Sequence, residues 1–274
     1  MLNLLKIEFI KVRFRTFLMV LVATLLLHTT VVSTLVFIGN DSMYINPLIL
    51  GYVSYNAYQF AGVYVVVGLL AASVVGGEFS GRTLGIGIVS ANNQRVDLIL
   101  AKFVLIGLLS AAMPAITWVI VAIVSVIQLI VDPNLGSVEA NWWESILGSL
   151  LMVIRMSLVI GFYSALALAL ALITRSAIFT LMAAFLLFLV EWIAITVLDR
   201  FDAMQWAVLF PREWGSRWLS LTEAGARDAL GGDIGEIYTL SVSEITFGFA
   251  LLAGTILLVA GTATLFKHRD IVEI

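Results

Sequence analysis

Long apolar stretches separated by short polar segments dominate the pattern of this chain. A helix needs about 20 mainly apolar residues to cross the hydrocarbon core of a membrane. Counting on that rule predicts six spans, at about residues 16–39, 58–76, 98–131, 146–173, 177–198 and 244–266. The third stretch is longer than a span requires, so we expect it to tilt or to project beyond the bilayer.

Composition supports a membrane protein. Of the 274 residues, 61% are hydrophobic and 12% are charged, whereas soluble domains have about 45–50% and about 25%. This excess is too large for one soluble core and predicts an all-α membrane protein, a single domain over residues 1–274. The net charge of −3 argues against a nucleic-acid partner. The absence of cysteine excludes disulfides and thiolate metal sites, and no metal motif occurs.

The positions of Lys and Arg predict the orientation of the spans. If the chain crosses the membrane six times, ten basic residues fall on the same side: Lys6, Lys11, Arg13, Arg15, Arg82, Arg95, Lys102, Arg175, Lys267 and Arg269. The other side receives Arg200, Arg212, Arg217 and Arg227, all in one longer loop. Positive charges in short loops mark the cytoplasm, so both termini are predicted to be cytoplasmic.

The segment before the first span has two interpretations. Leu2, Leu5, Phe9 and Val12 recur at helical spacing, which is typical of an amphipathic helix lying at the membrane interface. The alternative is a merely positively charged flank. The apolar stretch that follows is longer than the core of a cleavable signal peptide, so we interpret it as a retained membrane helix.

The predicted outer loops, at about residues 40–57, 132–145 and 199–243, are unequal in length. The second contains Trp142 and Trp143, and the largest contains Trp206, Trp214 and Trp218. Tryptophan at these positions is typical of the membrane–water interface, and we favour this interpretation over ligand binding. Gly248, Gly254 and Gly261 in the last span, like Gly107 in the third, are expected to permit close helix packing and not to line a pathway.

Motifs for catalysis or nucleotide binding are absent from the sequence. No G-x-x-x-x-G-K-[ST] segment occurs, so the chain has no P-loop with which to cradle a nucleotide. No H-E-x-x-H segment occurs either, and no serine stands in a recognisable hydrolase arrangement. We therefore expect no catalytic residues on this chain and do not expect it to be an enzyme.

A polar, glycine-punctuated segment at residues 77–84 separates the second and third predicted spans. Glu78 and Arg82 stand four residues apart, which places them on one face if the segment is helical. One interpretation is a short helix along the inner face that a soluble partner could grip. The other is a solvated loop with two basic residues.

Residues 77–84, Gly-Glu-Phe-Ser-Gly-Arg-Thr-Leu, resemble the motif after the second span in ABC-2 type permeases of bacterial ATP-binding-cassette transporters. Arg95 and Lys102 stand where that family has a basic residue and a lysine. Residues 5–11 resemble the family's opening segment, and residues 173–176 its short inner turn between spans four and five. Six spans and a largest outer loop before the last span also fit.

The resemblance implies a mechanism and partners. Such permeases work as pairs, with a second copy or a homologue, on two separate P-loop ATPase subunits that bind ATP and Mg. The segment between spans two and three would be the coupling helix, in contact with the ATPase through Glu78, Phe79, Gly81, Arg82, Thr83 and Leu84. Cofactors are therefore expected on the partner and none on this chain.

Two charged residues, Arg155 and Glu191, fall inside the fourth and fifth predicted spans. Charged side chains within a membrane are costly and usually pair or face a cavity. Both lie at similar depth on adjacent antiparallel helices, so they could form a buried ion pair that fixes helix register. A role in the substrate path, or an interfacial position for one of them, remains open.

These features predict the permease subunit of an ATP-driven exporter in a bacterial plasma membrane. The resemblance implies a peptide, drug or lipid-like substrate, antimicrobial peptides among them. With its modest outer loops, the short chain resembles the peptide- or drug-exporting and self-immunity members of the family more than the polysaccharide exporters. A non-transporting membrane sensor or scaffold is one alternative. A membrane-embedded lipid enzyme is another, and only the outer loop with Arg212, Glu213, Arg217, Glu223 and Arg227 could supply its polar residues.

Overall fold

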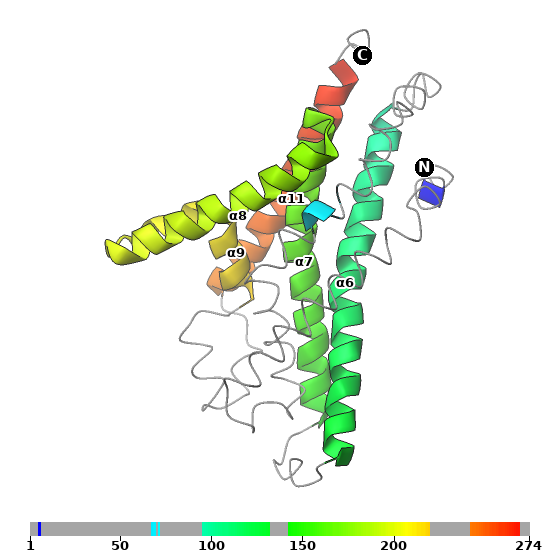
Figure 1. Ribbon diagram of the computed structural model, residues 1–274, viewed down its shortest axis with the longest axis vertical. Helices are drawn as coiled ribbons and strands as arrows, with labels where there is room; N and C mark the ends of the chain where they lie inside the picture. The colour runs from blue at the N-terminus through cyan, green and yellow to red at the C-terminus, as the bar shows by residue number, and fades with distance from the viewer. Residues whose placement is uncertain are drawn as a thin grey trace.

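The computed structural model describes residues 5–6, 67–69, 71, 95–131, 142–219 and 242–268. Every regular element among these residues is helical. The elements are α6 (Arg95–Val131), α7 (Trp142–Thr174), α8 (Ala177–Arg200), the 3₁₀ helix η4 (Met204–Leu209), α9 (Pro211–Trp218) and α11 (Val242–His268) (Figure 1). The described part of the chain therefore confirms the predicted all-α class.

Four of the predicted spans are confirmed as long apolar helices. The segments suited to crossing a membrane are Val96–Ile116, Val153–Thr174, Ile178–Arg200 and Ile245–Leu265. The first predicted span lies outside the described residues, whereas residues 67–69 and 71 of the second are helical. The chain is thus a multi-pass membrane protein, and the full count of six spans stays a prediction.

One predicted boundary was wrong, and one predicted outer loop contains short helices. Trp142 and Trp143 were assigned to a loop but form the first turn of α7, because a hydropathy criterion stops near Glu144 whereas the helical backbone continues through it. The predicted loop at 199–243 also contains η4 and α9. Pro211 begins α9 at its first position, where a missing N–H costs no helical hydrogen bond.

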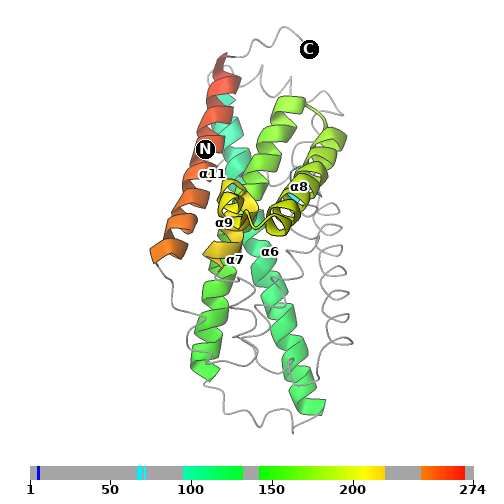
Figure 2. The ribbon, with the colours of Figure 1, turned by 90° about the vertical axis from the view of Figure 1, so that its left-hand side faces the viewer.

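Helix α7 lies at the centre of the bundle. It packs against α6, α11 and α8. Within the membrane-spanning part of α7, 67% is buried inside the protein, whereas the corresponding share for α8 is 11%. Figure 1 shows α6 and α7 alongside each other, and in the view of Figure 2 the two helices cross. The core includes Leu105 and Ile106 of α6 and Ile160 and Leu168 of α7. The interface between α6 and α7 therefore forms much of the core, and α8 and α11 pack against α7.

One buried polar contact crosses the α6–α7 interface. Ser110 Oγ and Ser164 Oγ are 2.5 Å apart and both residues are fully buried. The Ser110 hydroxyl donates to the carbonyl oxygen of Ile106 at 2.7 Å, so the Ser164 hydroxyl is the donor to Ser110. Such a bond fixes the register of two otherwise apolar helices.

Three helix termini lie on the side that the predicted topology gives them. The start of α6, the turn between α7 and α8, and the end of α11 lie at one end of the bundle, here called the Arg175 end (Figure 1). Arg95 begins α6 and Arg175 lies in the turn. Arg95 and Arg175, two of the basic residues predicted to share one side, therefore lie at the same end of the bundle. The cytoplasmic position of both chain termini stays a prediction.

A tight turn joins α7 to α8 and sends α8 away from the bundle (Figure 1). Arg175 has a φ of 55°, the left-handed region that residues with a Cβ rarely adopt. Ser176 then caps α8, its hydroxyl accepting a hydrogen bond from the backbone N–H of Phe179 at 3.2 Å. The sequence at 173–176 therefore encodes a sharp reversal without glycine.

Candidate functional site

The two charged residues within the spans are both buried. Arg155 on α7 is 2% exposed and Glu191 on α8 is 4% exposed, although most of α8 faces outward. Charged groups inside a membrane protein require polar partners because hydrocarbon offers them none. Their surroundings therefore define the candidate site.

Trp218, at the end of α9, contacts Arg155 twice. Its indole Nε1–H donates to the backbone carbonyl oxygen of Arg155 at 3.1 Å. The guanidinium carbon also lies 5.9 Å from the centroid of the Trp218 ring, at the outer limit for a cation–π interaction. A residue 63 positions away in the sequence thus helps to hold the arginine.

Tyr163 provides a contact for Glu191. Its hydroxyl donates to Oε2 of Glu191 across the α7–α8 interface, at a long 3.4 Å. Tyr163 in turn meets Phe162 edge to face, with centroids 5.4 Å apart and planes at 79°, a favourable arrangement of aromatic rings. The Phe162 ring lies 6.3 Å from that of Trp214 on α9. Aromatic side chains therefore connect the polar residues of α7 and α8 to α9.

Two glycines of α11 make room for these aromatic rings. A Cβ at Gly254 would lie 2.8 Å from Cε2 of Phe162, and one at Gly248 would overlap the six-membered ring of Trp218. The expectation of close packing at these positions is confirmed, with aromatic side chains as the neighbours. At Gly107 and Gly261 no atom of the described residues lies within 4 Å of where a Cβ would stand, so the described helices show no close packing there.

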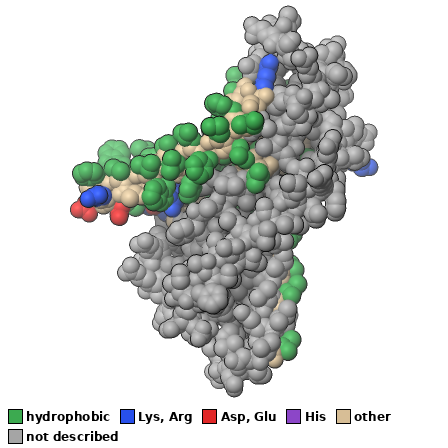
Figure 3. Space-filling model, viewed as in Figure 1, with side chains coloured by type: hydrophobic (Ala, Val, Ile, Leu, Met, Phe, Trp, Pro, Cys, Tyr) green, Lys and Arg blue, Asp and Glu red, His purple; other side chains and the backbone are tan. Residues whose placement is uncertain are grey.

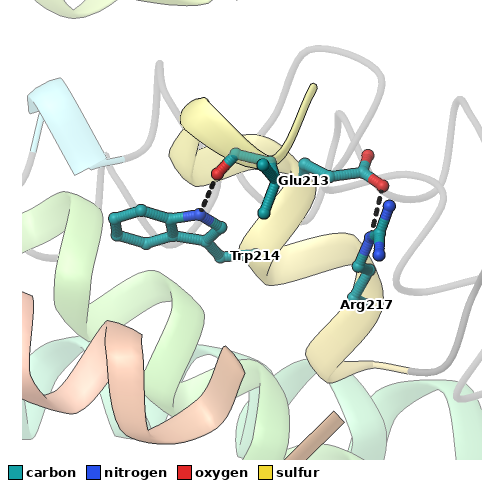
Figure 4. A network of polar contacts seen from close by, with 4 residues as sticks. Glu213, Trp214 and Arg217 are labelled. Atoms are coloured by element: carbon teal, nitrogen blue, oxygen red, sulfur yellow. Dashed lines mark hydrogen bonds and ion pairs between the residues drawn. The ribbon is translucent and has the colours of Figure 1, made fainter. Parts of the chain in front are cut away.

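Polar contacts fix the position of α9 beside these aromatic rings (Figure 4). The Trp214 indole N–H donates to the carbonyl oxygen of Val208 in η4 at 2.6 Å. Arg217 Nε lies 2.7 Å from Oε1 of Glu213, one turn earlier, and its guanidinium carbon is 5.2 Å from the Phe247 ring on α11. The helix is thus tied to both η4 and α11.

The predicted site residues are only partly brought together. Arg155 and Glu191 lie on adjacent, contacting helices, and the contacts described for them lead to Trp218 and Tyr163. Their mutual ion pair stays a prediction. The coupling residues Glu78, Phe79, Gly81, Arg82, Thr83 and Leu84 lie outside the described residues, so their role also stays a prediction.

Sequence reasoning missed the partners of the two charged residues. Tyr163 is one of many apolar or aromatic residues in its span, and Trp218 was interpreted as interfacial. One signal was available: Trp214 and Trp218 stand four residues apart, as do Glu213 and Arg217. This spacing gives a short helix an aromatic face and a charged face.

Comparison with protein families identifies the chain. A family model described as ABC-2 family transporter protein matches residues 4–191, which is more than two thirds of the 274 residues. No curated protein and no solved structure matches. The matched range includes the motif at residues 77–84 and ends at Glu191, before η4 and α9. The chain belongs to the ABC-2 transporter family, whose members are membrane subunits of transporters.

Proposed function

We propose that this chain is the permease subunit of an ATP-driven exporter in a bacterial plasma membrane. The family match over residues 4–191 carries this proposal, together with the four long apolar helices. The sequence contains no P-loop, so the energy must come from separate ATPase subunits. Two such subunits, with ATP and Mg bound to them, would serve this permease and a second copy or homologue.

The coupling segment at residues 77–84 would transmit the work of the ATPase. Glu78 and Arg82 would form charged contacts with the partner, and Phe79 and Leu84 would supply apolar ones. A partner can shift the permease between states only if it binds one state better than the other. ATP binding must therefore change the affinity of the ATPase for one arrangement of this segment.

The described helices suggest how such a shift would be transmitted. α7 packs against α6, α8 and α11, so a movement of the Arg175 end would carry the central helix with it. Buried Arg155 and Glu191 would hold α7 and α8 in register during the movement.

The substrate is proposed to be a peptide, drug or lipid-like molecule, with antimicrobial peptides as the class to test first.

Purification of the chain with its native partners tests the proposal. We expect a P-loop ATPase to accompany it and its activity to respond to candidate peptides. Glu78→Ala and Arg82→Ala should separate ATP hydrolysis from transport in vesicles without loss of expression, whereas Asn92→Ala, in the same predicted inner segment, serves as the matched control. Wild-type transport by both variants would exclude the coupling role. Recovery of partners without an ATPase would favour the sensor or scaffold alternative.

A further inference from the structure

Exposed apolar side chains follow one face of α6 from its spanning segment almost to the end of the helix. Val104, Leu108, Val119, Ile123 and Ile130 are 40–73% exposed. At about 100° per residue, these positions of the continuous helix lie within about 100° of arc. At a rise of about 1.5 Å per residue, the first and the last are about 39 Å apart along the axis. We name these five residues the α6 face.

The α6 face is longer than the exposed apolar surface of α11. The spanning segment of α11 runs from Ile245 to Leu265, which are both exposed, and Glu244 precedes it in the sequence. At the same rise this segment covers about 30 Å, which equals the usual hydrocarbon thickness of about 30 Å. A bilayer that fits α11 is therefore too thin for the α6 face.

Contacts with α7 fix the level of α6 relative to α11. The Ser110 hydroxyl of α6 bonds to that of Ser164, and Gly254 of α11 lies against the ring of Phe162. Ser164 and Phe162 are only about 3 Å apart along the axis of α7. Ser110 and Gly254 therefore lie at nearly the same level in the bundle.

The excess length of α6 lies at the end of the bundle opposite the Arg175 end. Measured along each helix in that direction, Ile130 is about 30 Å beyond Ser110, whereas Ile245 is about 14 Å beyond Gly254. Figures 1 and 2 both show α6 and α7 continuing past the start of α11 at this end. Tilting the whole bundle shortens the span of both helices, so it does not remove the difference between them.

The tip of α8 shows how an apolar surface of this protein ends. Figure 3 shows apolar side chains along much of α8 up to charged groups at its tip, where Asp199, Arg200 and Asp202 are exposed. Along α6, no charged residue follows Lys102 in the sequence until Asp132. Charged side chains are costly in hydrocarbon, so their absence over this length is what contact with acyl chains requires.

We propose that the α6 face contacts acyl chains along its whole length, so that the leaflet opposite the Arg175 end is thicker beside α6 than beside α11. The occupant of this surface is lipid with long acyl chains. A bilayer accommodates a longer apolar stretch by such local thickening.

Continuity with the spanning segment carries this assignment. Val104 and Leu108 lie within the segment Val96–Ile116, and the same exposed face continues from them to Ile130. The first turn of α7 contains Trp142 and Trp143 and lies at the same end of the bundle as the end of α6. Tryptophan is typical of the border between hydrocarbon and headgroups. The assignment does not depend on the transport function.

Site-directed spin labelling tests the proposal in the full-length chain. The sequence has no cysteine, so Ile130→Cys and the controls Leu108→Cys and Asp199→Cys each give one labelling site. After reconstitution in vesicles of phosphatidylcholine and phosphatidylglycerol, collisions of the label with oxygen and with a water-soluble nickel chelate are compared. Relative to position 199, oxygen should exceed the chelate severalfold at position 130, as it should at position 108.

Either of two other results at position 130 would overturn the proposal. Preference for the chelate, as at position 199, would place the end of α6 in water. A label shielded from both reagents would indicate a protein neighbour, such as a second copy.

The thickness of the bilayer gives a second measurement. The wild-type chain should unfold at a higher temperature in vesicles of lipids with long acyl chains than in vesicles of lipids with short ones. Ile123→Ser combined with Ile130→Ser shortens the apolar face, so this variant should lose most of that difference. Val104→Ser combined with Leu108→Ser, inside the spanning segment, is the matched control and should keep it. An equal difference in the two double variants would contradict the proposal.

Discussion

The indole of Trp218 occupies the space that a side chain at Gly248 would need. The same indole donates a hydrogen bond to the backbone of Arg155 at 3.1 Å. One tryptophan on α9 thus joins α11 to α7 beside a buried charge. This contact links three elements that lie far apart in the sequence and makes the docking of α9 sensitive to a single methyl group.

Gly248→Ala should therefore destabilise the protein. The added methyl group must displace the Trp218 ring, and overpacking of this kind costs about 1–3 kcal/mol. Thermal unfolding in detergent, followed by tryptophan fluorescence, would measure the loss. Gly261→Ala is the matched control on the same helix, because its methyl group meets open space among the described residues. Equal behaviour of the two variants would contradict the packing argument.

The spans were predictable and the docking of α9 was not. The apolar stretches at 98–131, 146–173, 177–198 and 244–266 correspond to α6, α7, α8 and α11 within four residues at each end, because an apolar stretch in a membrane must satisfy its backbone polar groups internally and therefore forms a helix. The burial of Arg155 was predictable, because a charged side chain within a span faces the protein interior and not the lipid. Its contact with Trp218 was not, since a tryptophan near a span end suits the interface equally well.

The charged pair gives a second prediction, which concerns Arg155 and Glu191. Arg155→Ala alone should be more destabilising than Arg155→Ala combined with Glu191→Ala, because the single change strands a buried carboxylate. Removing one partner of a buried pair costs about 3–5 kcal/mol. Chemical or thermal unfolding of the single and double variants forms a complete cycle. Additive losses would show that the two residues do not pair.

The hydroxyl contact between α6 and α7 can be tested in the same way. Ser110→Ala and Ser164→Ala should each lower the free energy of unfolding, and the double variant should lose less than the sum. Coupling of polar side chains between membrane helices averages about 0.6 kcal/mol, so the cycle requires precise unfolding curves. Ser157→Ala is a suitable control, because the Ser157 hydroxyl donates within its own helix to Val153 at 2.7 Å. A cycle with no coupling would mean that the two hydroxyls do not stabilise the α6–α7 interface.

The turn between α7 and α8 gives the last prediction. Arg175 adopts a φ of 55°, and a residue with a Cβ pays about 1–2 kcal/mol there compared with glycine. Glycine also loses more backbone entropy on folding, so Arg175→Gly should stabilise the folded protein slightly or leave it unchanged. Arg175→Val should destabilise it clearly, because β-branched residues tolerate this region least. Thermal unfolding should place the valine variant below the wild type, and the glycine variant level with the wild type or slightly above it. A valine variant as stable as the wild type would show that the turn relaxes to another conformation.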